Sequence, residues 1–422
     1  MLLSASTQSQ GWRDHFIQLH SVALSNNSLS HKLKEIADSF RQHLAVDHSP
    51  YLRRKMEIGI SALEQAAEGD YSGIGQQFRN LVSTPLEEAE LEHLLFLVVK
   101  DVDARKPPHP LIIHCTLDRR VLEAQKTLRS PAFLNGLAER LNVGSYPPSA
   151  LAGRVQGVNI INHAGYARYA LFADLVYEMD WTTSHVDGGL LFSIVAEEFI
   201  RQDLALVDAL FPEEGRRLRQ LGILNLEQTK FLFNVFLSLH DTLGHIVPYP
   251  VHHWVKRLIG PFLLDPFEEL GADTQFFWMT TGKKMRPFLD QILTEEETKA
   301  LPILWLMKRI CHYARRGSSK DAIHGDLMED GDARLGILFW QYFLDHGVIA
   351  RDGNHFRLDH DLLTVTVERL LDDWLAIEAE LPGGVEPYSR ALSDFYLKYR
   401  SSDRLTGKWE IPVDLRRSPA PL

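Results

Sequence analysis

Residues 236–245 have the sequence FLSLHDTLGH, an apolar helical run that ends in two histidines and a carboxylate. Imidazole and carboxylate groups together bind zinc, iron and related divalent ions, so this stretch predicts a metal site on a helix. His240 and His245 are five residues apart, a spacing that turns α-helical side chains about 140° from each other. The two histidines can share one ion only if the helix widens by one residue, as in a π-bulge, and Gly244 would ease that distortion.

A third ligand is expected from residues 267–273, FEELGAD, which begin a second apolar helical run. Glu269 and Asp273 are four residues apart and therefore share one face of a helix. One carboxylate would bind the metal, while the other would orient a ligand histidine from behind, as outer carboxylates commonly do in metal sites.

These two stretches resemble the dipeptidyl peptidase III metallopeptidases. That family carries His-Glu-x-x-x-His on a helix, followed by a Glu-Glu-x-x-Ala-(Glu/Asp) helix that supplies the third zinc ligand. HDTLGH at 240–245 is similar to the first motif and EELGAD at 268–273 to the second. The resemblance covers about 190–380 and implies that His240, His245 and Glu269 are the metal ligands. The sequence is still more similar to an uncharacterised bacterial family with the same His-Asp pair.

The resemblance also implies roles for the neighbouring carboxylates. Asp241 stands where the family has its catalytic glutamate. Asp273 and Glu268 stand where carboxylates would lie behind the ligands. The implied architecture is a two-lobed, helical, zincin-like metal-binding scaffold.

The chain departs from the family at two positions. Asp241 is one methylene shorter than glutamate, whereas a general base must come within about 2.6–3.2 Å of the proton that it takes. The family's transition-state histidine has no counterpart either, since counting back from 333–334 reaches Asp330 and the nearest histidine is His324. His324 and Tyr249 are the candidates for donating hydrogen bonds to an oxyanion.

The predicted ligands are suited to zinc, which lowers the pKa of a bound water to about 7 and polarises a carbonyl. The first expectation is therefore a metal-dependent hydrolase acting on an amide or ester of a short peptide or amino-acid conjugate. Two histidines and one carboxylate also describe the Fe(II) site of non-haem oxygenases, so iron is the alternative metal. A catalytically inactive binding protein and a His-Asp phosphohydrolase remain open alternatives.

Composition and charge exclude other classes of protein. The 422 residues carry a formal net charge of −11, which argues against a nucleic-acid partner. No apolar stretch approaches the roughly 20 residues needed to cross a bilayer, so we expect no membrane association. Cys115 and Cys311 are the two cysteines, and we interpret them as buried thiols of a cytoplasmic protein.

The fold predicted from periodicity is mainly α with a small β component. Strands are expected at 94–99, 111–113 and 155–161, residues 166–340 are expected to be almost wholly helical, and Asp352-Gly353 predicts a hairpin after a helix at 334–346. A long amphipathic helix is expected from about 361 to 381. We expect a helical region with a small sheet at 1–160, a helical metal-binding domain at 161–400 and a tail at 401–422.

Short charged runs near these segments are typical of solvated helix faces. Lys308-Arg309 and the acidic group Glu197, Glu198 and Asp203 are each expected to be solvated helix faces. An acidic cluster beside the metal site is the alternative for the second group.

Overall fold

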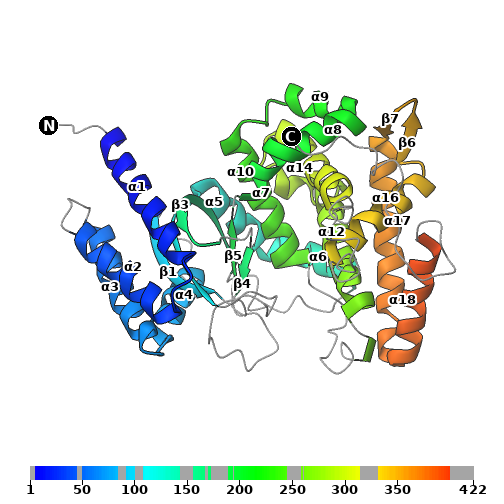
Figure 1. Ribbon diagram of the computed structural model, residues 1–422. Coiled ribbons are helices and arrows are strands. Elements are labelled where there is room, and N and C mark those ends of the chain that lie inside the picture. Colours follow the sequence, from blue (N-terminus) through cyan, green and yellow to red (C-terminus); the bar gives the residue numbers. More distant parts are fainter. Residues whose placement is uncertain are drawn as a thin grey trace. The chain divides into compact units, whose positions relative to one another are not determined.

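The computed structural model describes residues 5–44, 50–83, 92–99, 108–142, 155–166, 170–172, 189–192, 194–244, 258–259, 261–313 and 331–399. The chain divides into two compact units (Figure 1), of which unit 1 is Met1–Glu123 with Ser149–Ile194 and unit 2 is Ala124–Pro148 with Val195–Leu422. The domain boundary near 160 stays a prediction, and the tail at 401–422 lies outside the described residues.

Unit 1 consists of helices and a mixed five-stranded sheet with the order β1-β2-β3-β5-β4. Strands β1 to β3 are antiparallel neighbours, whereas β3 and β5 run parallel. The elements are α1 (Ala5–Ala23), α2 (Leu29–His43), α3 (Pro50–Ala67), α4 (Ser72–Ser83), β1 (Glu92–Val99), β2 (His109–Leu117), β3 (Val155–Ala164), β4 (Ala170–Phe172) and β5 (Gly189–Phe192). Helix α5 (Arg119–Leu128) follows β2 in the chain, and its residues are divided between the two units.

The three predicted strands are confirmed as β1, β2 and β3. The prediction that residues 166–340 are almost wholly helical is wrong at β4 and β5, which have three and four residues. Segments this short contain too few residues to show an alternating pattern, so partners in the sheet must define them.

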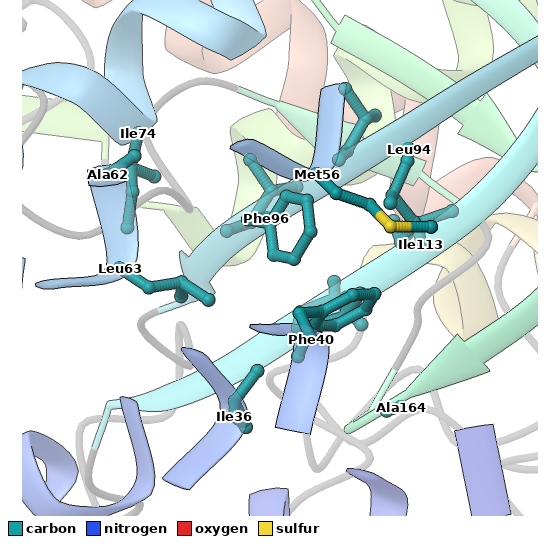
Figure 2. Packing of buried hydrophobic residues seen from close by; sticks show 14 of the residues in the cluster. Ile36, Phe40, Met56, Ala62, Leu63, Ile74, Leu94, Phe96, Ile113 and Ala164 are labelled. Carbon is teal, nitrogen blue, oxygen red and sulfur yellow. The ribbon is translucent and has the colours of Figure 1, made fainter. Parts of the chain in front are cut away.

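The core of unit 1 lies where α2 and α3 pack on β1 (Figure 2). Phe40 and Phe96 meet edge to face with ring centroids 4.7 Å apart, and both are fully buried. Gly59 on α3 faces the Phe96 ring so closely that a Cβ there would overlap it. The absence of a side chain at Gly59 therefore sets how closely α3 approaches the sheet.

The described residues of unit 2 are helical apart from one hairpin. Its elements are α6 (Pro131–Leu141), α7 (Ile194–Glu198), η3 (Phe199–Asp203), α8 (Leu204–Leu210), α9 (Pro212–Gln220), α10 (Leu226–Leu237), η4 (Ser238–Gly244), α12 (Pro261–Thr281), α13 (Arg286–Leu289), α14 (Glu295–Met307), η5 (Lys308–Tyr313), α16 (Gly331–Asp345), β6 (Ile349–Asp352), β7 (His355–Leu358), α17 (His360–Glu378), η8 (Leu381–Gly383) and α18 (Val385–Tyr399). Helix α12 is central, since it packs against η4, α14, α16 and α17 (Figure 1).

Several local predictions in unit 2 are confirmed. The hairpin forms between β6 and β7, with Gly353 at φ 61° in its turn, and α17 follows it. The widened helix predicted around His240 is present as the π-helix η4. Two further π-helices, η3 and η5, continue α7 and α14. π-turns are rare and occur frequently at functional sites, and the described part of unit 2 contains these three.

The described residues include no helix long and apolar enough to span a membrane. Cys115 and Cys311 are both buried, as expected, and burial raises the pKa of the Cys115 thiol to about 12.

A buried carboxyl group lies where α12, α17 and α18 meet. Glu378 is 2% exposed, and its Oε1 accepts a hydrogen bond from the Tyr388 hydroxyl at 3.0 Å. Burial raises the pKa of Glu378 to about 7; the Tyr388 hydrogen bond opposes this rise, and the nearby charge of Glu268 adds to it. The packed helices therefore favour the neutral form of this side chain.

We predict that Glu378→Gln stabilises the protein at pH 8 and does so by much less at pH 5. The pKa of Glu378 is about 7 in the folded protein and about 4.3 in an unfolded chain, so stability falls as pH rises through this interval. Glutamine carries no charge, and the gain at pH 8 should approach roughly 3 kcal/mol. Denaturant unfolding at both pH values measures the effect, with the exposed Glu380→Gln as control. Equal effects of Glu378→Gln at pH 5 and pH 8 would contradict the prediction.

Candidate metal centre

His240 is positioned by the widened helix η4, which continues α10 without a break. Its ring is 5% exposed and lies 5.1 Å from the Phe236 ring and 5.9 Å from the Trp305 ring, centroid to centroid. At the start of η4, the Ser238 hydroxyl donates to the Asn234 carbonyl at 2.8 Å. The Phe236 and Trp305 rings and the hydrogen bond of Ser238 thus restrict the orientation of the His240 side chain.

Three carboxylates face the His240 ring. Its Nε2 lies 3.1 Å from Asp273 Oδ1 and 3.3 Å from Glu269 Oε2, and its Nδ1 lies 3.7 Å from Asp241 Oδ1. Burial alone would lower the pKa of His240, but the bonds to Asp241, Asp273 and Glu269 together raise it well above its ordinary value. A positive charge is therefore strongly favoured here, whether a proton or a metal ion carries it.

Asp273 is the buried anchor of this cluster. It is fully buried and accepts hydrogen bonds from Trp305 Nε1 at 2.7 Å and from Arg309 Nε at 2.6 Å. Burial would raise the pKa of Asp273, but the charge of Arg309 and the contact with His240 lower it below its usual value. The ionised carboxylate is thus held in a fixed orientation on the Nε2 side of the His240 ring.

Arg309 joins the cluster to a second helix. Its guanidinium binds Asp273 and also Asp332 Oδ1 at 2.5 Å, and it lies 3.8 Å from Glu269 Oε2. The group lies over the rings of Trp305 and Tyr313, 4.8 and 4.7 Å from their centroids. Arginine suits this position because its planar fork bonds carboxylates and stacks on aromatic rings at once.

The prediction that Lys308 and Arg309 form a solvated face is wrong, since each side chain is 1% exposed. Their counter-charges come from other elements, which a local charge pattern cannot reveal. A signal was nonetheless present, because the preceding residues 300–307 have the sequence ALPILWLM. A helix that is apolar all round is buried, and charges within a buried helix need partners.

The last turn of η4 is held tightly against α12. The Gly244 carbonyl accepts a bond of 2.7 Å from Gln275 Nε2, and a Cβ at Gly244 would lie 2.7 Å from the Ala272 carbonyl oxygen. Gly244 is not among the residues with positive φ. It is therefore required for close approach of the two backbones, and its expected role in easing the widened turn stays a prediction.

The structure separates the two adjacent glutamates of α12. Glu269 points to His240 and Arg309, whereas Glu268 lies near enough to Glu378 on α17 for its charge to raise the pKa of that carboxyl. This geometry agrees with Glu269 as the group that faces the centre. The supporting role expected for Glu268 stays a prediction.

The remaining predicted residues, His245, Tyr249 and His324, lie outside the described residues. Within the described ranges, no group of three or more His, Cys, Asp and Glu side chains is arranged to hold an ion. Two observations nevertheless fit a metal. His240 Nε2 and Glu269 Oε2 are 3.3 Å apart. This is the distance between two ligand atoms of a tetrahedral zinc ion whose bonds are about 2.0–2.1 Å long. Asp241 Oδ2 is also buried without a hydrogen-bond partner among the described residues.

The fold and this cluster together define a helical scaffold with a candidate metal centre between a π-helix and a facing α-helix. No protein family and no curated protein matched the sequence.

Solved structures did match. The structure of DPP III from Caldithrix abyssi is similar with a TM-score of 0.60 at 12% identity, over 98% of this chain and 76% of that chain. The structure of dipeptidyl-peptidase III from Corallococcus sp. strain EGB is similar with a TM-score of 0.51 at 14% identity, over 94% and 75%. At these identities the likeness establishes the shared fold, so the fold expected from the motifs is confirmed.

We predict that Gly244→Ala destabilises the protein by about 1–3 kcal/mol, the usual effect of overpacking a tight contact. The added methyl would press on the Ala272 backbone, which cannot move aside as a flexible side chain would. Gly383→Ala is the matched control, because the nearest atom to its Cβ would be Pro387 Cγ at 3.5 Å, an ordinary contact. Thermal unfolding compares the two variants, and equal midpoints would refute the steric argument.

Proposed function

We propose that this protein is a metal-dependent hydrolase of short peptides, with zinc held by His240, His245 and Glu269. The observation that carries the proposal is the 3.3 Å separation of His240 Nε2 and Glu269 Oε2, close to that of two ligand atoms on one zinc ion, with Asp273 on the same side of the ring. The similar structures are peptidases by name, dipeptidyl-peptidase III, which supports a peptide as the substrate. Bound zinc would supply a water of pKa near 7 and would polarise the peptide carbonyl.

The residues behind His240 prepare it for a metal. Asp273 and Glu269 both face Nε2, so a proton and a metal compete for the same nitrogen. Arg309 keeps Asp273 ionised and oriented, which limits rotation of the His240 ring. Such outer partners commonly affect metal affinity 10–100-fold by orienting the ligands. The cluster is therefore suited to hold its geometry with or without the ion.

Asp241 is the proposed proton acceptor. It neighbours His240 in η4, its side chain is 12% exposed, and its Oδ2 has no partner among the described residues. A largely buried carboxylate with one oxygen unengaged can take a proton from water that attacks the peptide carbonyl carbon. The widened helix places Asp241 Oδ1 3.7 Å from Nδ1 of the preceding His240 ring.

The metal assignment is tested by elemental analysis of protein purified without chelators. We predict about one equivalent of zinc in the wild type and loss of that zinc in His240→Ala, His245→Ala and Glu269→Gln. Glu268→Gln is the matched control and should retain zinc, because that side chain is placed toward Glu378. Far-UV circular dichroism verifies that each variant is folded. Full occupancy in either histidine variant would remove the basis of the proposal, and one equivalent of iron in place of zinc would favour an oxygenase.

The role of Asp241 is tested by a pair of variants. Asp241→Asn should keep zinc and lower turnover by roughly 10²–10⁴-fold, the usual contribution of positioned proton transfer. Asp241→Glu restores a carboxylate and should keep or raise cleavage of short peptides, followed by mass spectrometry. If Asp241→Asn instead loses the metal while Glu269→Gln retains it, Asp241 is a ligand and a His-Asp phosphohydrolase replaces the peptidase.

A further inference from the structure

One buried carboxylate bonds to both ends of the widened turn η5. Asp203, the last residue of η3, binds Lys308 Nζ at 2.8 Å through Oδ2 and His312 Nδ1 at 2.7 Å through Oδ1. Lys308 is the first residue of η5 and His312 the fifth. Residues four apart share one face of a helix, so both bonds lie on the same face of η5.

Asp203 is ionised although it is buried. Burial would raise its pKa, but the hydrogen bond from His312 and the charge of Lys308 lower the pKa below its usual value. Asp203 is 3% exposed, so the expectation of a solvated acidic face is wrong for this residue. Its two partners follow 105 and 109 positions later in the chain, and Lys308 also reaches Glu198 Oε2 at 3.2 Å.

The same turn carries the arginine of the metal cluster. Arg309 binds Asp273 Oδ2 at 2.6 Å and lies 3.8 Å from Glu269 Oε2. Successive helical residues point about 100° apart, so Lys308 and Arg309 leave η5 in different directions. Lys308 meets η3 and α7, whereas Arg309 meets α12 and α16. One rotation of η5 about its axis must therefore satisfy both side chains.

Directional bonds are needed to hold η5 in that rotation. The preceding residues 300–307 are apolar and buried, and apolar burial has no preferred direction. Trp305 does make a directional bond, to Asp273, but it precedes the widened turn. The two bonds of Asp203 act within the turn itself and fix the face that Lys308 and His312 share.

We propose that Asp203 is a positioning residue for the metal centre. Its bonds to Lys308 and His312 hold η5 in the rotation that brings the Arg309 guanidinium to Asp273 and Glu269, and they thereby set the affinity of the centre for zinc. The inference rests on the zinc site proposed above. Asp203 acts through η5 and has no part in the chemical step.

A pair of substitutions separates positioning from simple stabilisation. A buried ion pair can often be replaced by apolar side chains of similar volume without loss of stability. Asp203→Leu with Lys308→Met makes this replacement and leaves no buried charge without a partner in the pair. If the pair only stabilised the fold, this double variant would bind zinc as the wild type does.

We predict that the double variant binds zinc about 10-fold more weakly, at the lower end of the range for outer partners, because Asp203 acts through further residues. Competition with a chromophoric chelator measures the affinity. Urea unfolding of the zinc-free protein should give a midpoint close to that of the wild type. Asp203→Asn keeps the shape of the side chain and serves, with the same expected loss of affinity, if the double variant does not fold.

The matched control is Glu197→Leu with Lys230→Met. Lys230 is also buried, and its Nζ lies 3.7 Å from Glu197 Oε1. This pair joins α10 to α7 and includes no residue of η5. Zinc affinity should stay at the wild-type value in the control. Equal weakening in both double variants would show a general effect of lost charge and would overturn the role of Asp203.

A second measurement does not depend on zinc. Arg309 Nε–H donates to Asp273, so in the zinc-free protein its ¹⁵N signal, assigned by its loss in Arg309→Lys, should be protected from exchange with solvent. The double variant at Asp203 and Lys308 should lose this protection, and the control should keep it. Wild-type zinc affinity or a protected Arg309 signal in the folded double variant would overturn the inference. A wild type that binds no zinc overturns the proposed hydrolase, and the Arg309 signal then decides on Asp203 alone.

Discussion

The buried ion pair between Arg309 and Asp273 is the interaction on which the candidate centre depends. Both side chains are at most 1% exposed, and burying two charges carries a penalty of several kcal/mol per ion unless every polar atom is engaged. Asp273 accepts hydrogen bonds from Trp305 and Arg309 and contacts His240 Nε2. Arg309 also binds Asp332 and lies over two aromatic rings. The pair keeps Asp273 ionised and oriented where it contacts His240 Nε2.

The widened helical turns η3, η4 and η5 hold several of the polar side chains of unit 2. η4 holds His240 and Asp241, η3 ends at Asp203, and η5 contains both Arg309 and His312. A π-turn shifts the direction of later side chains relative to an α-helix, so residues at spacings that would diverge can face one point. η4 packs on α12, whereas η3 and η5 contact each other and are joined by the buried ion pair between Lys308 and Asp203.

Much of the site was accessible to local reasoning, because its chemistry is concentrated in two helical segments. Spacing required a widened helix at His240, and the structure has one; the i,i+4 relation of Glu269 and Asp273 placed both on the side that meets His240. Lys308 and Arg309 were assigned to the surface because adjacent charges usually lie there, and the partners that bury them come from distant elements. His312 was missed for the same reason, since its partner Asp203 is 109 residues away.

The sequence by itself determined the elements whose signals are local: strands β1 to β3, the Asp352-Gly353 hairpin, α17 and the widening of η4. Only the tertiary structure decided which buried charges pair, why Gly244 lacks a side chain, and that β4 and β5 are strands. The physical reason is the range of the interactions. Periodicity and turn chemistry act over a few residues, whereas desolvated ion pairs and backbone-to-backbone contacts exist only after distant segments have been brought together.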